Sequence, residues 1–116
     1  MIMRIFLGLV LALSTGMLVS AEFPPADLEF FEKRVRPLLA EYCYKCHSAK
    51  SKKLKGELRL DYREGAIKGG ETGPAVVPGK PGESLLVESI RYQNEDLEMP
   101  PKKRLSDSQV TDLTEW

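Results

Sequence analysis

The chain has 116 residues, with 17 basic and 17 acidic side chains, so its formal net charge at pH 7 is zero. This balance argues against a nucleic-acid-binding protein, because such proteins usually carry a basic surface. A chain of this length suits one domain with a modest hydrophobic core.

Residues 1–21 have the pattern of a secretory leader. Arg4 supplies the positive start, an apolar run follows from Ile5 to Leu13, and the small residues up to Ala21 fit a cleavage site. A retained anchor helix is the alternative, but the apolar run is shorter than the about 20 residues that span a bilayer. We therefore expect export to the periplasm or another extracytoplasmic compartment, with a mature domain of residues 22–116.

A helix is expected from Asp27 to Tyr42, with Asp27 as its cap after two prolines. Its apolar residues recur at steps of three and four, which places them on one face. They are Leu28, Phe31, Val35, Leu38, Leu39 and Tyr42. Pro37 lacks a backbone donor and clashes with the preceding turn, so it predicts either a kink or a second short helix with Pro37 in its first turn.

This helix runs into Cys43-Tyr44-Lys45-Cys46-His47, which spells C-x-x-C-H and contains both cysteines and the only histidine. The pattern is the attachment sequence of a covalent c-type haem. Two thiols three positions apart can each add across one haem vinyl group, and the adjacent imidazole can ligate the iron. We therefore expect one haem c, held covalently by Cys43 and Cys46, with His47 as an iron ligand.

Three other interpretations of the cysteine pair stay open. A thioredoxin-like dithiol needs a strand–helix–strand setting, whereas the residues before Cys43 have a helical pattern. A structural zinc site needs four ligands, of which this cluster supplies three. A plain disulfide across so short a loop would stabilise the fold little.

A basic stretch and then a glycine-rich stretch follow the cysteine pair. The basic excess predicts either a solvated loop or a docking patch for an acidic redox partner; it consists of Lys50, Lys52, Lys53, Lys55 and Arg59. From Gly56 to Pro81, six glycines and three prolines predict a long irregular connection with one helical turn at residues 62–67. Such long loops are usually functional, and we expect this one to wrap around an edge of the haem.

Two further helices are expected in the last third of the chain. The first runs from Glu83 to Tyr92. The second begins near Ser106, whose spacing to Gln109 suits a capping box. Its apolar stripe reaches Trp116 with no cap after it, which indicates the N-terminal fragment of a longer multidomain protein.

Met99 is the candidate for the second iron ligand. It is the only methionine outside the leader, and it lies in a polar loop that has no apolar face to complete. Pro100 and Pro101 stiffen the backbone after it, as expected where a sulfur atom must be held in place. Filling a gap in the packing is the alternative role. With both His47 and Met99 as ligands, the iron is six-coordinate and suited to single-electron transfer.

The chain as a whole resembles class I cytochrome c domains, and more closely the planctomycete-type cytochrome c domain, from about Phe30 to Trp116. Five stretches carry the resemblance: residues 31–39, C-Y-K-C-H-S at 43–48, G-E-L-R-L-D at 56–61, G-P-A-V-V-P-G-K-P at 73–81 and M-P-P at 99–101. The resemblance implies haem attachment at Cys43 and Cys46, His47 as proximal ligand and Met99 as distal ligand. It also implies that further domains follow.

The sequence therefore predicts an all-α domain of three to four helices around one covalent haem c, with the first and last helices packed together and a long Gly/Pro-rich loop. Its expected function is electron transfer outside the cytoplasm, by itself not an enzyme. Its partner is a redox protein or downstream domains of the same chain, with no nucleic acid and no membrane span after leader cleavage. Two alternatives stay open: a haem-based sensor or catalytic module with a displaceable Met99, and a cofactor-free interaction domain with a disulfide.

Overall fold

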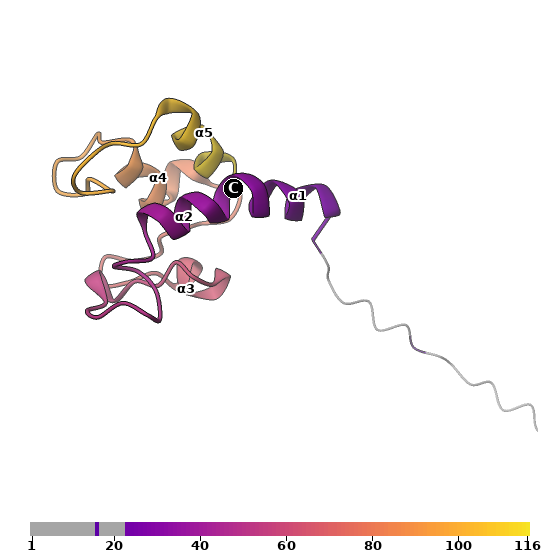
Figure 1. Cartoon of the computed structure of the whole chain (residues 1–116), viewed down its shortest axis with the longest axis horizontal. Coiled ribbons are helices and arrows are strands. Elements are labelled where there is room, and N and C mark those ends of the chain that lie inside the picture. Colours follow the sequence, from indigo (N-terminus) through magenta and orange to yellow (C-terminus); the bar gives the residue numbers. More distant parts are fainter. Residues whose placement is uncertain (1–15, 17–22) are drawn as a thin grey trace, which may run out of the picture.

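The computed structural model describes Gly16 and residues 23–116, so the leader predicted for residues 1–21 falls outside the described residues except for Gly16. The described part is helical (Figure 1), and its only β-type pairing is an isolated bridge between Gly70 and Gly73. This confirms the all-α prediction. None of the described helices is long and apolar enough to cross a membrane.

The first three helical elements follow one another without a break and form one rod. They are α1 (Pro25–Phe30), the π-helical η1 (Phe31–Val35) and α2 (Arg36–Tyr42). The rod begins two residues before Asp27, and no side chain caps it. The predicted cap is therefore wrong, because a proline at the first helical position has a suitable fixed φ and no N–H that needs a partner.

Pro37 lies in the first turn of α2, which confirms the second of the two predicted arrangements. The transition into α2 passes through a wider turn, in which the Arg36 N–H donates to the carbonyl of Phe31, five residues earlier. A proline in a regular helix clashes with the carbonyl four residues before it. The wider π-helical register gives the chain room to continue without ending the rod.

The middle of the chain is an irregular connection, as predicted. It contains a 3₁₀ turn, η2 (Lys55–Glu57), a short helix, α3 (Arg63–Lys68), and a second 3₁₀ turn, η3 (Pro81–Glu83). Two of its loops touch at a glycine: a Cβ placed on Gly70 would lie only 2.1 Å from the carbonyl oxygen of Gly56. The lack of a side chain at Gly70 therefore allows this contact.

The next helix, α4 (Leu85–Ile90), is shorter at both ends than the predicted span of residues 83–92. Before it, the Ser84 hydroxyl accepts the Val77 N–H at 2.9 Å, so Ser84 belongs to the preceding loop. After it, Tyr92 adopts a positive φ of 56°, which ends the helical path. Tertiary bonds therefore limit a helix that its apolar pattern alone would extend.

The last helix, α5 (Asp107–Glu115), has the predicted capping box. The Ser106 hydroxyl accepts the Gln109 N–H at 3.2 Å, and the Gln109 side chain accepts the Ser106 N–H at 3.0 Å. Two donors at the helix start, which the helix itself cannot satisfy, are thus paired.

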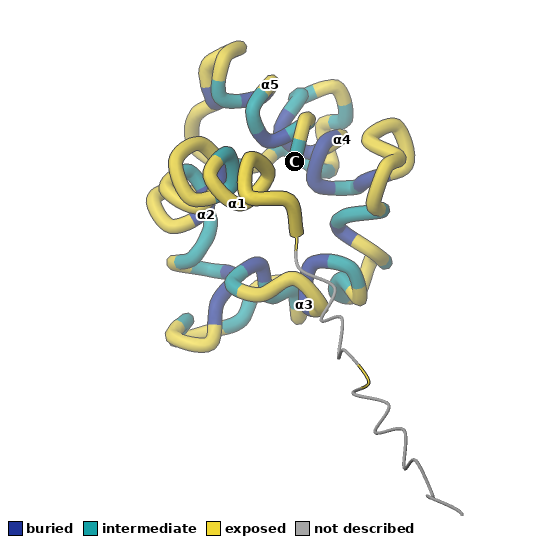
Figure 2. Tube along the Cα trace, turned by 90° about the vertical axis from the view of Figure 1, so that its right-hand side faces the viewer, coloured by how far each residue is buried: buried dark blue, intermediate teal, exposed yellow. Residues whose placement is uncertain are grey.

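The rod and α5 pack against each other, as predicted. Arg34 donates to both carboxylate oxygens of Asp112 at 3.1 Å, and the ring centroids of Phe31 and Trp116 are 5.4 Å apart. Ten of the eleven buried hydrophobic residues form one cluster, which draws on the rod, the connection, α4, α5 and the residue before its cap. Its members are Val35, Leu39, Leu60, Ala66, Ala75, Leu86, Ile90, Leu105, Val110 and Leu113. Figure 2 shows where buried residues lie along the chain.

Candidate haem-attachment site

Both cysteines and the histidine lie on a turn that continues directly from α2. The Cys43 N–H donates to the Leu39 carbonyl at 2.9 Å. The Cys43 carbonyl accepts from the amides of Cys46 and His47 at 3.2 and 3.0 Å. Residues three and four positions apart share one face of such a turn, so the local backbone places both cysteines and the histidine within one turn of the chain. Both cysteines are free thiols and half-buried.

The imidazole of His47 is buried and oriented by the chain itself. Its Nδ1 lies 3.1 Å from the carbonyl oxygen of Leu58. Because a carbonyl can only accept, Nδ1 carries the hydrogen, and in the neutral ring Nε2 then has the free lone pair. The Leu60 amide donates to the His47 carbonyl at 2.8 Å, so backbone and ring are tied to the same segment. An imidazole arranged in this way can ligate a metal through Nε2.

Asp61 connects this segment to the residues that follow the histidine. Its carboxylate accepts two bonds from the Arg59 guanidinium, at 3.0 and 2.9 Å, and one from the Ala49 N–H at 3.1 Å. The bond from Arg59 is the main reason that the pKa of Asp61 falls to about 2, and the Ala49 amide adds to this. The carboxylate is therefore charged at any physiological pH.

The thiol of Cys43 has the opposite character to that of a reactive dithiol. Burial raises its pKa to about 11, and the neighbouring Cys46 adds to the shift. Thioredoxin-like dithiols work through a thiolate whose pKa is lowered. The described residues also contain no strand before Cys43. Both observations disfavour the dithiol interpretation.

The zinc interpretation has no support in the geometry. Across the described residues, no three or more histidine, cysteine, aspartate or glutamate side chains gather as a metal-binding group. A structural zinc site needs four ligands, so this part of the chain cannot complete one alone.

Met99 lies on the irregular segment between α4 and α5, and 37% of its surface is exposed. Its N–H donates to the Ser89 carbonyl at 3.0 Å, and the Tyr92 hydroxyl donates to the carbonyl of Pro100, which follows a cis peptide bond. These bonds fix the loop to the end of α4. In Figure 1 this loop and the chain that leaves α2 lie at the same, left-hand end of the domain.

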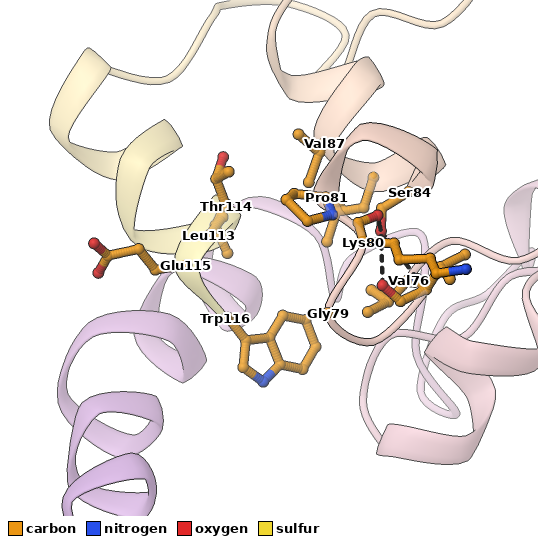
Figure 3. Close-up of a pocket in the computed structure, with 12 residues that line it drawn as sticks. Val76, Gly79, Lys80, Pro81, Ser84, Val87, Leu113, Thr114, Glu115 and Trp116 are labelled. Carbon is orange, nitrogen blue, oxygen red and sulfur yellow. Dashed lines mark hydrogen bonds between the residues drawn. The ribbon is translucent and has the colours of Figure 1, made fainter.

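A cavity of about 370 Å³ lies elsewhere, between α4, α5 and the loop before η3 (Figure 3). Its lining is mostly apolar and includes Val76, Pro81, Leu86, Val87, Leu113 and Trp116. None of the four predicted haem residues lines it. The cavity is therefore separate from the candidate site.

The structure thus groups Cys43, Cys46 and His47 on one turn, while Met99 comes from a different loop. No sequence pattern identified the groups that hold the histidine, namely the Leu58 carbonyl and the Arg59–Asp61 pair. One signal for the pair was present, because alternate residues of an extended stretch point to the same side. No comparable signal marks a backbone carbonyl as a ring partner.

A helix that ends in C-x-x-C-H, followed by a segment that orients the histidine ring, is the arrangement expected of a c-type cytochrome. The family model of the planctomycete cytochrome c domain matches residues 43–103, more than half of the chain, and the chain belongs to this family. The match covers the cysteine turn, the glycine-rich connection and the Met99 loop. Haem binding and electron transfer are the general properties of such a family. No curated protein and no solved structure matches the chain.

Proposed function

We propose that the protein is an extracytoplasmic c-type cytochrome domain that holds one haem covalently at Cys43 and Cys46 and transfers single electrons. One observation carries the proposal: two free thiols share a turn with an imidazole whose Nδ1 is engaged and whose Nε2 is available. Membership of a cytochrome c family supports it.

The donor set fits the chemistry of attachment. Each thiol S–H adds across a vinyl C=C bond, so that a C–S bond forms, the hydrogen goes to the neighbouring carbon, and nothing is released. No oxidant or reductant is needed for this addition. Because the pKa of Cys43 is about 11, its thiol stays protonated near neutral pH.

The remaining residues have separate roles in the proposed site. A bound haem supplies an iron that alternates between the ferric and ferrous states. His47 offers Nε2 as the proximal ligand, and Met99 offers its thioether sulfur as the distal ligand. A methionine ligand raises the reduction potential relative to a second histidine.

The main test is the intact mass of the protein after export from a host that matures c-type cytochromes. We expect the mass of the chain plus one haem, retained under denaturing conditions. A Cys43→Ala/Cys46→Ala double variant should lack the covalent increment. A parent protein that is colourless and has two alkylatable thiols would rule out the proposal, and a mass lower by two hydrogens would favour the disulfide-bonded interaction domain.

The role of Met99 is tested by Met99→Ala, with Lys102→Ala as the control in the same loop. We expect a low-spin ferric spectrum for the parent and for Lys102→Ala. Met99→Ala should show a high-spin spectrum and a lower reduction potential. An unchanged spectrum and potential in Met99→Ala would exclude Met99 as the ligand.

A haem-based sensor or catalytic module is the second candidate, and the exposure of Met99 favours it, because an exposed ligand is easier to displace. The ferrous parent protein should then bind carbon monoxide at neutral pH. Failure to bind carbon monoxide would leave electron transfer as the supported function.

We propose that an acidic redox partner docks on the lysines near the cysteine turn. These lysines are Lys45, Lys50, Lys52, Lys53 and Lys55. All five are exposed, and none of them forms an ion pair within the described residues. Electron transfer to ferricyanide, an anion, should slow as salt rises. Lys52→Glu should weaken this dependence, whereas Lys33→Glu on the rod should not. Equal effects of the two variants would contradict a local docking patch.

We also propose that the leader is removed after Ala21. The purified protein should be recovered from the periplasmic fraction, and its N-terminal peptide should begin at Glu22. Recovery with Met1 intact in the membrane fraction would instead indicate a retained anchor.

A further inference from the structure

The segment at residues 58–61 holds His47 through two bonds on one side of an extended stretch. The Leu58 carbonyl lies 3.1 Å from Nδ1 of the ring, and the Leu60 amide donates to the His47 carbonyl at 2.8 Å. Alternate residues of such a stretch face the same way, and a shift by one residue reverses their direction. The ring bond therefore depends on the register of this segment against the cysteine turn.

Asp61 fixes that register. One of its oxygens accepts the N–H of Ala49, which is two residues beyond the histidine, at 3.1 Å. The Arg59 guanidinium donates to both oxygens and lies over the Tyr62 ring, 4.6 Å from its centroid. Arg59, in the same segment, thus holds the Asp61 carboxylate in place, and the carboxylate in turn holds the chain after His47 through the Ala49 N–H.

We propose that Asp61, held by Arg59, is a positioning residue for the proximal ligand and thereby helps to set the reduction potential. The inference rests on the proposed function, in which His47 ligates the haem iron. No hydrogen bond joins Asp61 to the His47 ring among the described residues, so Asp61 acts through the carbonyl of Leu58.

The physical link is the bond from Nδ1–H to that carbonyl. A ring nitrogen that donates a hydrogen bond makes the imidazole a better electron donor through Nε2. Stronger donation stabilises the ferric state and lowers the reduction potential. The clamp is formed by Arg59, Asp61 and the Ala49 amide. If it is lost, the bond from Nδ1–H to the Leu58 carbonyl weakens and the reduction potential rises.

Charge alone would also move the potential, but with a different pattern. Removal of a negative charge favours the ferrous state and raises the potential, whereas removal of a positive charge lowers it. If the clamp only stabilises the fold, only the loss of charge changes the reduction potential, and the change has opposite signs for variants of Asp61 and Arg59. A positioning role gives the same sign for both.

The test measures the reduction potentials of Asp61→Ala and Arg59→Gln in the mature protein. Glu64→Gln is the control, because it removes one exposed carboxylate nearby that forms no ion pair within the described residues. We expect Asp61→Ala to raise the potential more than Glu64→Gln does, and Arg59→Gln to raise it as well. Any other pattern of signs overturns the inference.

Amide hydrogen exchange on the same purified proteins gives a readout independent of iron. Asp61→Ala should speed exchange at Ala49 by about tenfold or more, because a bond to a charged acceptor is lost. Exchange at Val110, in α5, should speed up by a smaller factor than exchange at Ala49. An unchanged rate of amide exchange at Ala49 would overturn the inference, even if the reduction potential shifts.

Two provisions keep the outcomes distinct. If Asp61→Ala does not fold, the potential of Arg59→Gln decides, since charge alone would lower it and the positioning role raises it. If the parent protein carries no covalent haem, the proposed function fails, and the exchange measurement still decides whether Asp61 holds the segment.

Discussion

Asp61 holds the segment at residues 58–61 against the cysteine turn. Its ionisation makes the stability of the protein depend on pH. Its folded-state pKa is about 2, below the ordinary value of 3.8, because Arg59 and the Ala49 amide favour the charged form. A lowered pKa stabilises the fold above the unfolded-state pKa, and this contribution is lost as the pH falls through the folded-state pKa.

We therefore expect the stability difference between the parent and Asp61→Asn to be constant from pH 5 to 7. The difference should shrink as the pH falls from about 3.8 to about 2, where the parent carboxylate becomes protonated. Urea unfolding at several pH values measures it. A difference that grows on acidification would contradict the assignment of the charged form to the folded state.

Gly70 is a position where the fold requires the absence of a side chain. An added Cβ would lie 2.1 Å from the Gly56 oxygen, a backbone atom that cannot move without shifting its loop. We expect Gly70→Ala to destabilise the protein by about 1–3 kcal/mol. Gly82→Ala is the control, because a Cβ there meets nothing within 4 Å, and its melting temperature should match or exceed that of the parent.

For single residues, the side chains of the candidate site could be predicted from the sequence, but the group that orients the histidine ring could not. C-x-x-C-H is a contiguous pattern, so the sequence alone identifies Cys43, Cys46 and His47 as candidates. The carbonyl that orients the ring belongs to Leu58, eleven positions away. Every residue has such a carbonyl, so only the path of the chain shows which one is used.

Among the elements, α5 has the most complete local stabilisation at its start. The side chains of Ser106 and Gln109 each accept the backbone N–H of the other residue, so both N–H groups are paired within the cap itself. The helix must form for Val110 and Leu113 to reach the core, so its cap affects global stability.

We expect Ser106→Ala to lower the free energy of unfolding by about 1 kcal/mol, since an N-cap hydroxyl is lost. Ser108→Ala, on an exposed position of the same helix, should change it by less than about 0.5 kcal/mol. Denaturant unfolding measures both. Equal effects of the two variants would show that the capping box does not stabilise α5.

Sequence patterns predicted the helices better than their ends. The capping box and the place of Pro37 in the first turn of a helix depend on neighbouring residues, so they were predictable. The ends of α4 were not, because Ser84 bonds to Val77 in the loop before it and Tyr92 turns toward Pro100 after it. These bonds are tertiary and have no counterpart in apolar periodicity.

For the molecule as a whole, one core connects the rod to the helix that lies farthest from it in sequence. Val35 and Leu39 are fully buried, and Leu113 is 2% exposed. The cysteine turn starts four residues after Leu39, so the packing of this leucine also positions the candidate site.

We expect Leu39→Ala to destabilise the protein by about 2–5 kcal/mol, the usual range for a cavity left by a fully buried leucine. Leu28→Ala is the control on the same rod, since 46% of that residue is exposed. Thermal unfolding distinguishes them. A similar melting temperature for both variants would contradict the central position of Leu39.

The helical class and the packing of first helix on last followed from amphipathic patterns, which are strong in both segments. The path of the connection did not, because glycines and prolines indicate where regular structure stops without indicating what the chain then touches. The cavity beside Trp116 was missed for the same reason, since its walls come from two stretches that lie far apart in the sequence, residues 76–87 and 113–116.

The long-range composition of the core also constrains the order of events during synthesis. Val35 and Leu39 leave the ribosome early, but they cannot be fully covered until α5, some seventy residues later, has emerged. Folding that waits for such distant contacts is slower than folding by local pairing. The nascent chain should therefore remain sensitive to protease, and accessible to chaperones, until residue 115 has emerged from the ribosome.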